Sequence, residues 1–117
     1  MSKDNERLTI WIKQDVRGVP GSELWKVMKA IFTCYLENGF VNFYITSIND
    51  GHHISGSLHY VNNAIDFQTL GLPIEKLQTA IDSFCKRYYL DRRCFELFYS
   101  GTHKKIFHLE YDVIRLR

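Results

Sequence analysis

A chain of 117 residues is long enough for one domain with a single hydrophobic core, and we expect that core at about 22–112 of a domain spanning 1–117. A hydrophobic fraction of 45% excludes a disordered chain, and no apolar run reaches the length of a membrane span. The net charge of +2 comes from scattered basic residues, which argues against nucleic acid as a partner. Residues 1–7 are polar and lack the apolar part of a signal peptide, so we expect cytoplasmic synthesis and a separate means of release if the protein acts outside the cell.

The first half of the chain predicts a short strand or extended arm at 8–12, where apolar residues begin to alternate with polar ones. Glycine and proline make 16–21 a loop. A helix follows, with Ser22 as its N-cap and Gly39 as its C-terminal stop. Its apolar residues recur at helical spacing, so one face is expected in the core: Leu24, Val27, Met28, Ile31, Cys34 and Tyr35. The β-branched and aromatic stretch 41–48 predicts a central strand.

The second half predicts a strand at 64–68, a helix and two more strands, 95–99 and 106–111. The helix has Pro73 in its first turn and stops near Leu90. Its buried stripe is expected to contain Ile74, Leu77, Ile81, Phe84, Cys85 and Tyr88. The order β-α-β-β-α-β-β predicts an α+β domain, in which two helices cover one face of a mainly antiparallel sheet.

Alternation along two of these strands predicts which side chains face away from the helices. Asp66 lies between Ile65 and Phe67, so the carboxylate is expected on the open face while its neighbours enter the core. His108 and Glu110 are two residues apart and share a face by the same rule.

The three cysteines are Cys34, Cys85 and Cys94. Their number is odd and they lack a Cys-x-x-Cys spacing, which favours buried thiols over a disulfide or a metal role.

The histidines are clustered, because three of the five lie within residues 50–66 and the other two lie near the C-terminus: His52, His53, His59, His103 and His108. Imidazole nitrogen and carboxylate oxygen both suit Zn²⁺, and a catalytic zinc site typically has three protein ligands and one open position. We predict His59, Asp66 and His108 as the ligands. A lone histidine on a strand is more often structural, so the prediction depends on the combination.

These residues carry a resemblance to a known family. Ser57-x-His59-x6-Asp66, with Ala64 two residues before the aspartate, resembles the Ser-x-His-x-x-Gly-x-Ala-x-Asp signature of the zinc D-Ala-D-Ala carboxypeptidases and L-alanyl-D-glutamate endopeptidases, which include phage endolysins. Residues 50–60 also resemble the zinc site of Hedgehog signalling domains, which share that fold. Residues 106–111 resemble the family's His-x-His-x-Glu-Tyr strand, whose second histidine is the third ligand.

The resemblance implies a Hedgehog/DD-peptidase-like fold and a zinc ion held by His59, Asp66 and His108. It also implies a zinc metallopeptidase in which metal-activated water attacks a peptide carbonyl. The substrates would be peptidoglycan stem peptides of the bacterial cell wall or other short peptides. His53 stands at the position of a catalytic histidine in the Hedgehog-type motif and could orient the water or stabilise the oxyanion.

The expected catalytic base is missing from its usual place. The family has a glutamate a few residues before its last ligand, where this chain has Thr102 and Lys105. Glu96 is the nearest upstream carboxylate and is our candidate base, with His103 as another possibility.

Because the chain departs from the family's pattern, a second hypothesis is a catalytically impaired zinc-binding module with a structural or ligand-binding role. Asn49 and Asp50 stand near the place of the family's substrate-binding arginine, and Asn62 replaces the usual glycine. A third possibility is a relic of the fold that binds no zinc. The sequence does not predict the oligomeric state or the bond that is cut.

Overall fold

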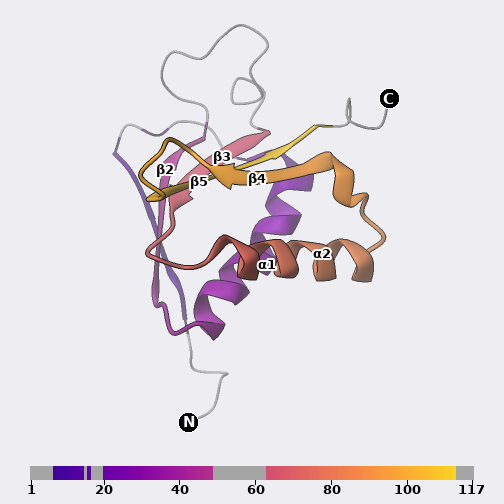
Figure 1. Cartoon of the computed structure of the whole chain (residues 1–117), viewed down its shortest axis with the longest axis horizontal. Helices are drawn as coiled ribbons and strands as arrows, with labels where there is room; N and C mark the ends of the chain where they lie inside the picture. The colour runs from indigo at the N-terminus through magenta and orange to yellow at the C-terminus, as the bar shows by residue number, and fades with distance from the viewer. Residues whose placement is uncertain (1–6, 15, 17–19, 49–62, 113–117) are drawn as a thin grey trace, which may run out of the picture.

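The computed structural model describes residues 7–14, 16, 20–48 and 63–112. These residues form the predicted succession of elements (Figure 1). In chain order, the elements are β1 (Thr9–Ile12), α1 (Ser22–Glu37), β2 (Asn42–Ser47), β3 (Ala64–Gln68), α2 (Ile74–Arg87), the short 3-10 helix η3 (Arg92–Cys94), β4 (Phe95–Tyr99) and β5 (Ile106–Tyr111).

The described strands form one five-stranded sheet in the order β1-β2-β3-β5-β4. The α+β class is as expected, but the sheet is mixed, because β1 runs parallel to β2 while the other three pairings are antiparallel. The backbone N–H groups of Thr9 and Lys13 donate to the carbonyls of Val41 and Ile45, at 2.8 and 3.0 Å. These bonds join β1 to β2, and the strand order places β1 at one edge of the sheet.

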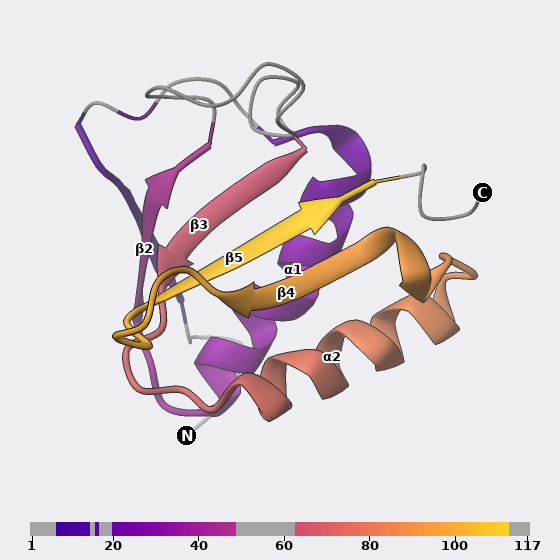
Figure 2. The same ribbon diagram turned by 45° about the horizontal axis from the view of Figure 1, so that its top comes forward.

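Both helices pack on the same face of the sheet, which Figures 1 and 2 show from two directions. All six residues of the predicted stripe on α1 are buried, so that prediction is confirmed. They meet strand residues that are almost fully buried, among them Phe43, Ile45, Ile65, Phe67, Phe107 and Leu109. Neither of the described helices covers the opposite face of the sheet, which we call the open face, and it holds the candidate site.

The two ends of α1 differ in how well the sequence predicts them. Ser22 is the first helical residue and not the N-cap; Gly21 takes that position, and no side chain caps the helix. Gly39 stops the helix as predicted, with a φ of +89° that glycine adopts without strain. The N–H groups of Gly39 and Phe40 then donate to the carbonyls of Leu36 and Tyr35, at 3.0 Å each.

Helix α2 is shorter than predicted at both ends. Pro73 is its N-cap and lies outside the helix, and the last helical residue is Arg87. Tyr88 was predicted to be buried, but it is the C-cap and is 52% exposed. The helix stops because Tyr89 adopts a left-handed φ of +57°, which lets the N–H of Leu90 donate to the Cys85 carbonyl at 2.9 Å. The buried residues of α2 are Leu77, Ile81 and Cys85.

Two further sequence expectations concern buried thiols and membrane spans. Cys34, Cys85 and Cys94 are all buried, and burial raises the pKa of the Cys34 and Cys85 thiols. Such thiols are poor nucleophiles and poor metal ligands. Among the described residues, neither helix is both long enough and apolar enough to cross a membrane.

Tyr35 joins α1 to the end of β3. Its buried hydroxyl, kept protonated because burial raises its pKa, donates to the Gln68 carbonyl at 2.8 Å. We expect Tyr35→Phe to lower the free energy of unfolding by about 1–2 kcal/mol, because the Gln68 carbonyl loses a buried donor. Urea unfolding measures this, with Tyr89→Phe as the control, since Tyr89 is 95% exposed. An equal loss in both variants would contradict the role of the hydrogen bond.

Candidate metal centre on the open face

Asp66 and His108 lie directly opposite each other on the neighbouring strands β3 and β5. Their strand neighbours Ile65, Phe67, Phe107 and Leu109 are fully buried against the helices. Because side chains alternate along a strand, Asp66 and His108 both point to the open face, as the sequence predicts. Two of the three proposed ligands, 42 residues apart in the chain, are thus brought into contact by strand pairing.

Each ring nitrogen of His108 meets a carboxylate. Nδ1 lies 2.6 Å from Oδ1 of Asp66, and Nε2 lies 2.8 Å from Oε1 of Glu110. The three side chains are only 13–18% exposed. Hydrogen bonds to ionised groups in such partly buried surroundings are short and strong, so the orientation of the ring is well defined.

The pKa of His108 is raised. Burial disfavours the charged imidazolium, but hydrogen bonds and charge from Asp66 and then from Glu110 outweigh it. The doubly protonated form of His108, in which each ring nitrogen donates to a flanking carboxylate, is therefore favoured relative to a free histidine.

This arrangement predicts how the stability of the metal-free protein depends on pH. Because the folded pKa of His108 lies above its unfolded value of about 6.5, the stabilisation is complete below that value and is lost as pH rises through the folded pKa. We therefore expect the difference in free energy of unfolding between wild type and His108→Gln to become smaller as pH rises from about 6.5 through the folded pKa. Urea titrations at a series of pH values measure it, and a difference that stays flat or rises with pH would contradict the ion pairs.

Phe98 also contacts His108. It lies opposite His108 on β4, and the two ring centroids are 4.6 Å apart with an interplanar angle of 31°. Sequence reasoning did not find this contact, because the register between β4 and β5 cannot be read from either strand alone. It did place Glu110 on the face of His108, but the bond to Nε2 became visible only in the structure.

The donor set of this pair suits a zinc ion. When Nε2–H donates to Glu110, the lone pair of Nδ1 points toward the Asp66 carboxylate, and a carboxylate behind the outer ring nitrogen is the usual support of a metal-binding histidine. Within the described ranges, no group of three or more His, Cys, Asp and Glu residues is arranged to hold a metal ion. His59, the third proposed ligand, and His53, a proposed catalytic residue, lie outside the described residues.

The two candidate bases occupy different places. Glu96 lies in register with Glu110, on the edge strand β4 and on the same face as Phe98. His103 belongs to the turn between β4 and β5, where its Nδ1 accepts a hydrogen bond from the Lys105 N–H at 3.0 Å. That bond ties the His103 ring to its own turn, so Glu96 remains our candidate base.

The register also shows how Ser47 lies relative to this pair. Ser47 of β2 pairs with Asp66, so that serine, aspartate and histidine form a row across the sheet. A serine nucleophile needs its histidine between the serine and the acid. Here Asp66 stands between Ser47 and His108, so the row is not a nucleophilic triad.

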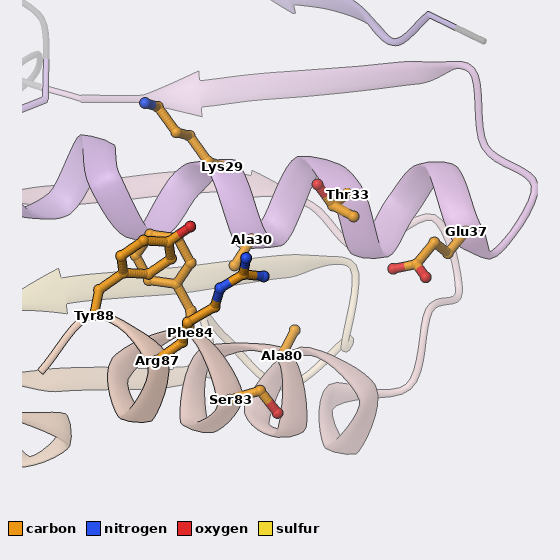
Figure 3. A pocket seen from close by; sticks show the side chains of 9 residues that line it. All are labelled: Lys29, Ala30, Thr33, Glu37, Ala80, Ser83, Phe84, Arg87 and Tyr88. Carbon is orange, nitrogen blue, oxygen red and sulfur yellow. The ribbon is translucent and has the colours of Figure 1, made fainter. Parts of the chain in front are cut away.

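A hollow of about 530 Å³ lies elsewhere, between α1 and α2 (Figure 3). It is lined by residues of the two helices and by Tyr88, and its lining contains no histidine. It therefore does not belong to the proposed metal centre.

Comparisons with protein-family models, with curated proteins and with solved structures found no match to this chain.

Proposed function

We propose that the protein is a zinc-dependent metallopeptidase of the endolysin or carboxypeptidase type, which hydrolyses short peptide bonds of bacterial peptidoglycan. One observation carries the proposal: Asp66 and His108 converge on the open face, with the outer nitrogen of His108 held by Glu110. A Hedgehog/DD-peptidase-like fold is part of the proposal, and the order of elements and the location of the pair on the uncovered face support it.

His59, Asp66 and His108 would hold the metal. When bound, zinc polarises a peptide carbonyl and lowers the pKa of its water. Glu110 fixes the tautomer and orientation of His108, and Phe98 covers one side of its ring. In this proposal Glu96 accepts the proton of the attacking water, while His53 orients that water or stabilises the oxyanion.

A second candidate function is a zinc-binding module that does not hydrolyse peptides. The position of Glu96 favours it, because this carboxylate lies opposite Glu110 and not beside the pair of Asp66 and His108. In this reading the metal stabilises the fold, and the open face binds a ligand without cutting it.

Release of new amino groups from purified peptidoglycan or muropeptides tests the peptidase. We expect hydrolysis by the zinc-loaded protein, and loss to background in His59→Ala, because three ligands are needed to keep the metal in place. Glu75→Gln is the control, since it changes an exposed side chain of α2, on the face of the sheet opposite to the pair. The proposal fails if zinc-loaded wild type and His59→Ala release the same number of amino groups.

A further inference from the structure

Exposed apolar side chains gather along β1, the strand at one edge of the sheet, which is the indigo strand beside β2 in Figure 2. Ile10, Trp11 and Ile12 are all exposed, and so is Val41, which comes directly before β2. The exposed fractions of these four side chains lie between 39% and 60%. Contiguous apolar surface of this kind typically marks a site of association with another protein.

Helix α1 extends this surface on the helix face of the sheet. Trp25 is 41% exposed and packs edge-on against Phe32, with 5.7 Å between the ring centroids. Phe32 packs in turn against Phe43, at 5.0 Å, and Phe43 is the partner of Ile10 in the sheet. Trp25 therefore lies on the flank of α1 that is next to β1. We call the following five residues the β1 edge surface: Ile10, Trp11, Ile12, Trp25 and Val41.

The backbone of β1 has hydrogen-bonding groups that are directed away from the sheet. The N–H groups of Thr9 and Lys13 donate toward β2. Because the direction of these groups alternates along a strand, the N–H and C=O groups of Ile10 and Ile12 point to the other side. The strand order gives β1 no second neighbour among the described strands. Such an edge is a template on which another strand can pair.

The other edge of the sheet, β4, is protected. The N–H of Tyr111 donates to Asn63, on the β3 side, so Phe95, its partner on β4, directs its carbonyl outward. Arg92 donates to that carbonyl through Nη1 at 2.6 Å, and Glu96 adds a charge to the strand. Proteins block sheet edges with such charged and covering side chains. Strand β1 itself contains no charged residue, so it is the less protected of the two edges.

We propose that the β1 edge surface binds a second copy of this chain, with the two β1 strands paired antiparallel about a two-fold axis at Trp11. Each Ile10 would exchange two hydrogen bonds with the partner's Ile12, which gives four bonds across the axis. The two Trp11 side chains would be neighbours on the open face, and the isoleucines would be neighbours on the helix face. The two five-stranded sheets would become one continuous sheet. This inference does not depend on the proposed function.

The charges beside β1 favour this arrangement. In the antiparallel register, Thr9 faces the partner's Lys13 and Leu8 faces the partner's Gln14, so no like charges meet. A parallel arrangement in register would place Lys13 beside the partner's Lys13. The antiparallel arrangement is also the one that a two-fold axis generates, and two-fold dimers are the commonest oligomers.

The size of the surface fits a weak dimer. Five side chains that are each about half exposed, in two copies, offer on the order of 1,000 Å² of apolar surface. That area is at the lower limit for a specific interface. The two-fold axis also places both α1 helices on the same side of the joined sheet, so that Trp25 of each copy contributes to the contact. We therefore expect a dimer that dissociates on dilution.

Sedimentation equilibrium of the full chain measures this association. Between about 1 and 500 µM, the average mass should rise from that of one chain toward that of two. Ile12→Lys puts a charge on the edge at a side chain that is already exposed, so it should fold and should weaken dimerisation at least about tenfold. Tyr89→Lys adds the same charge at an exposed ring after α2 and should dimerise like wild type.

Disulfide cross-linking tests the register. Residues at the centre of the proposed pairing would have Cα atoms about 4.5 Å apart, which a disulfide can span. Trp11→Cys should therefore form a disulfide-linked dimer under mild oxidation. Thr9→Cys should cross-link at least about tenfold more slowly, because this position would face the partner's Lys13. The three native cysteines are buried and do not compete.

Three results would overturn the proposal. The first is the mass of a single chain over the whole concentration range, and the second is equal dimerisation of wild type and Ile12→Lys. The third is equal cross-linking of Trp11→Cys and Thr9→Cys, which indicates random collision or a parallel arrangement. Circular dichroism checks that each variant folds. None of these substitutions changes Asp66 or His108, so a failure of the dimer is distinguishable from a failure of the peptidase proposal.

Discussion

Replacing Asp66 by asparagine is expected to lower zinc affinity at least about 100-fold and to reduce peptidoglycan hydrolysis to background. The substitution keeps the size of the side chain and removes the charge that would bind the metal beside Nδ1 of His108. Loss of a supporting carboxylate typically costs about 10- to 100-fold in metal affinity, and loss of a direct ligand should cost more. Glu110→Gln, which changes only the partner of Nε2, should therefore have the smaller effect.

Equilibrium dialysis with zinc and the amino-group assay measure both quantities. Glu75→Gln is a suitable control, because it removes an exposed carboxylate from the first turn of α2, and α2 packs on the face of the sheet opposite to the pair. Thermal unfolding of the metal-free variants checks that each one folds. Unchanged zinc affinity in Asp66→Asn would show that the contact with His108 is a metal-free ion pair and would remove the basis of the peptidase proposal.

Removing zinc from the loaded protein is expected to lower its stability by about 4 kcal/mol, if free zinc is first present at about 1,000 times its dissociation constant. For a domain of this size, that loss corresponds to a fall in the melting temperature of roughly 15 °C. The physical reason is that the donors come from β3 and β5, which are neighbours only in the folded sheet, so the metal binds the native state and not the unfolded chain.

A chelator melt followed by calorimetry or circular dichroism measures this difference. Chelator already saturated with zinc is the control for the additive, and Asp66→Asn should show a drop no more than about a third as large, because its zinc affinity is expected to be at least about 100-fold lower. The result also separates the candidate functions: a large drop without hydrolysis under any condition favours the zinc-binding module. No drop, together with no metal in elemental analysis, would contradict both.

The sequence predicts much of this fold because periodicity reports local geometry. Helical spacing identified every buried residue of α1, and alternation placed Asp66 and His108 on the open face of their strands. The sequence also predicted that the first helix ends at Gly39, because the left-handed backbone conformation that ends a helix favours glycine. Tyr89 holds the same left-handed position after α2, and a tyrosine there gives no signal in the sequence.

The remaining features depend on contacts between distant segments. The residues of β1 are exposed along its length, so their pattern does not reveal that the strand pairs in parallel with β2. The contact of Phe98 with His108 and the opposition of Glu96 and Glu110 both come from the register of β4 against β5. Two of the predicted ligands, Asp66 and His108, are in contact. His53 and His59 lie outside the described residues, so their proposed roles stay predictions.

The buried cysteines give the protein a built-in reporter of its own unfolding. Cys34 and Cys85 belong to the core between helices and sheet, and their thiols have raised pKa values. A thiol-reactive dye should therefore modify them only when the core opens, so the rate of labelling follows opening of the fold, whether or not the open face holds a ligand.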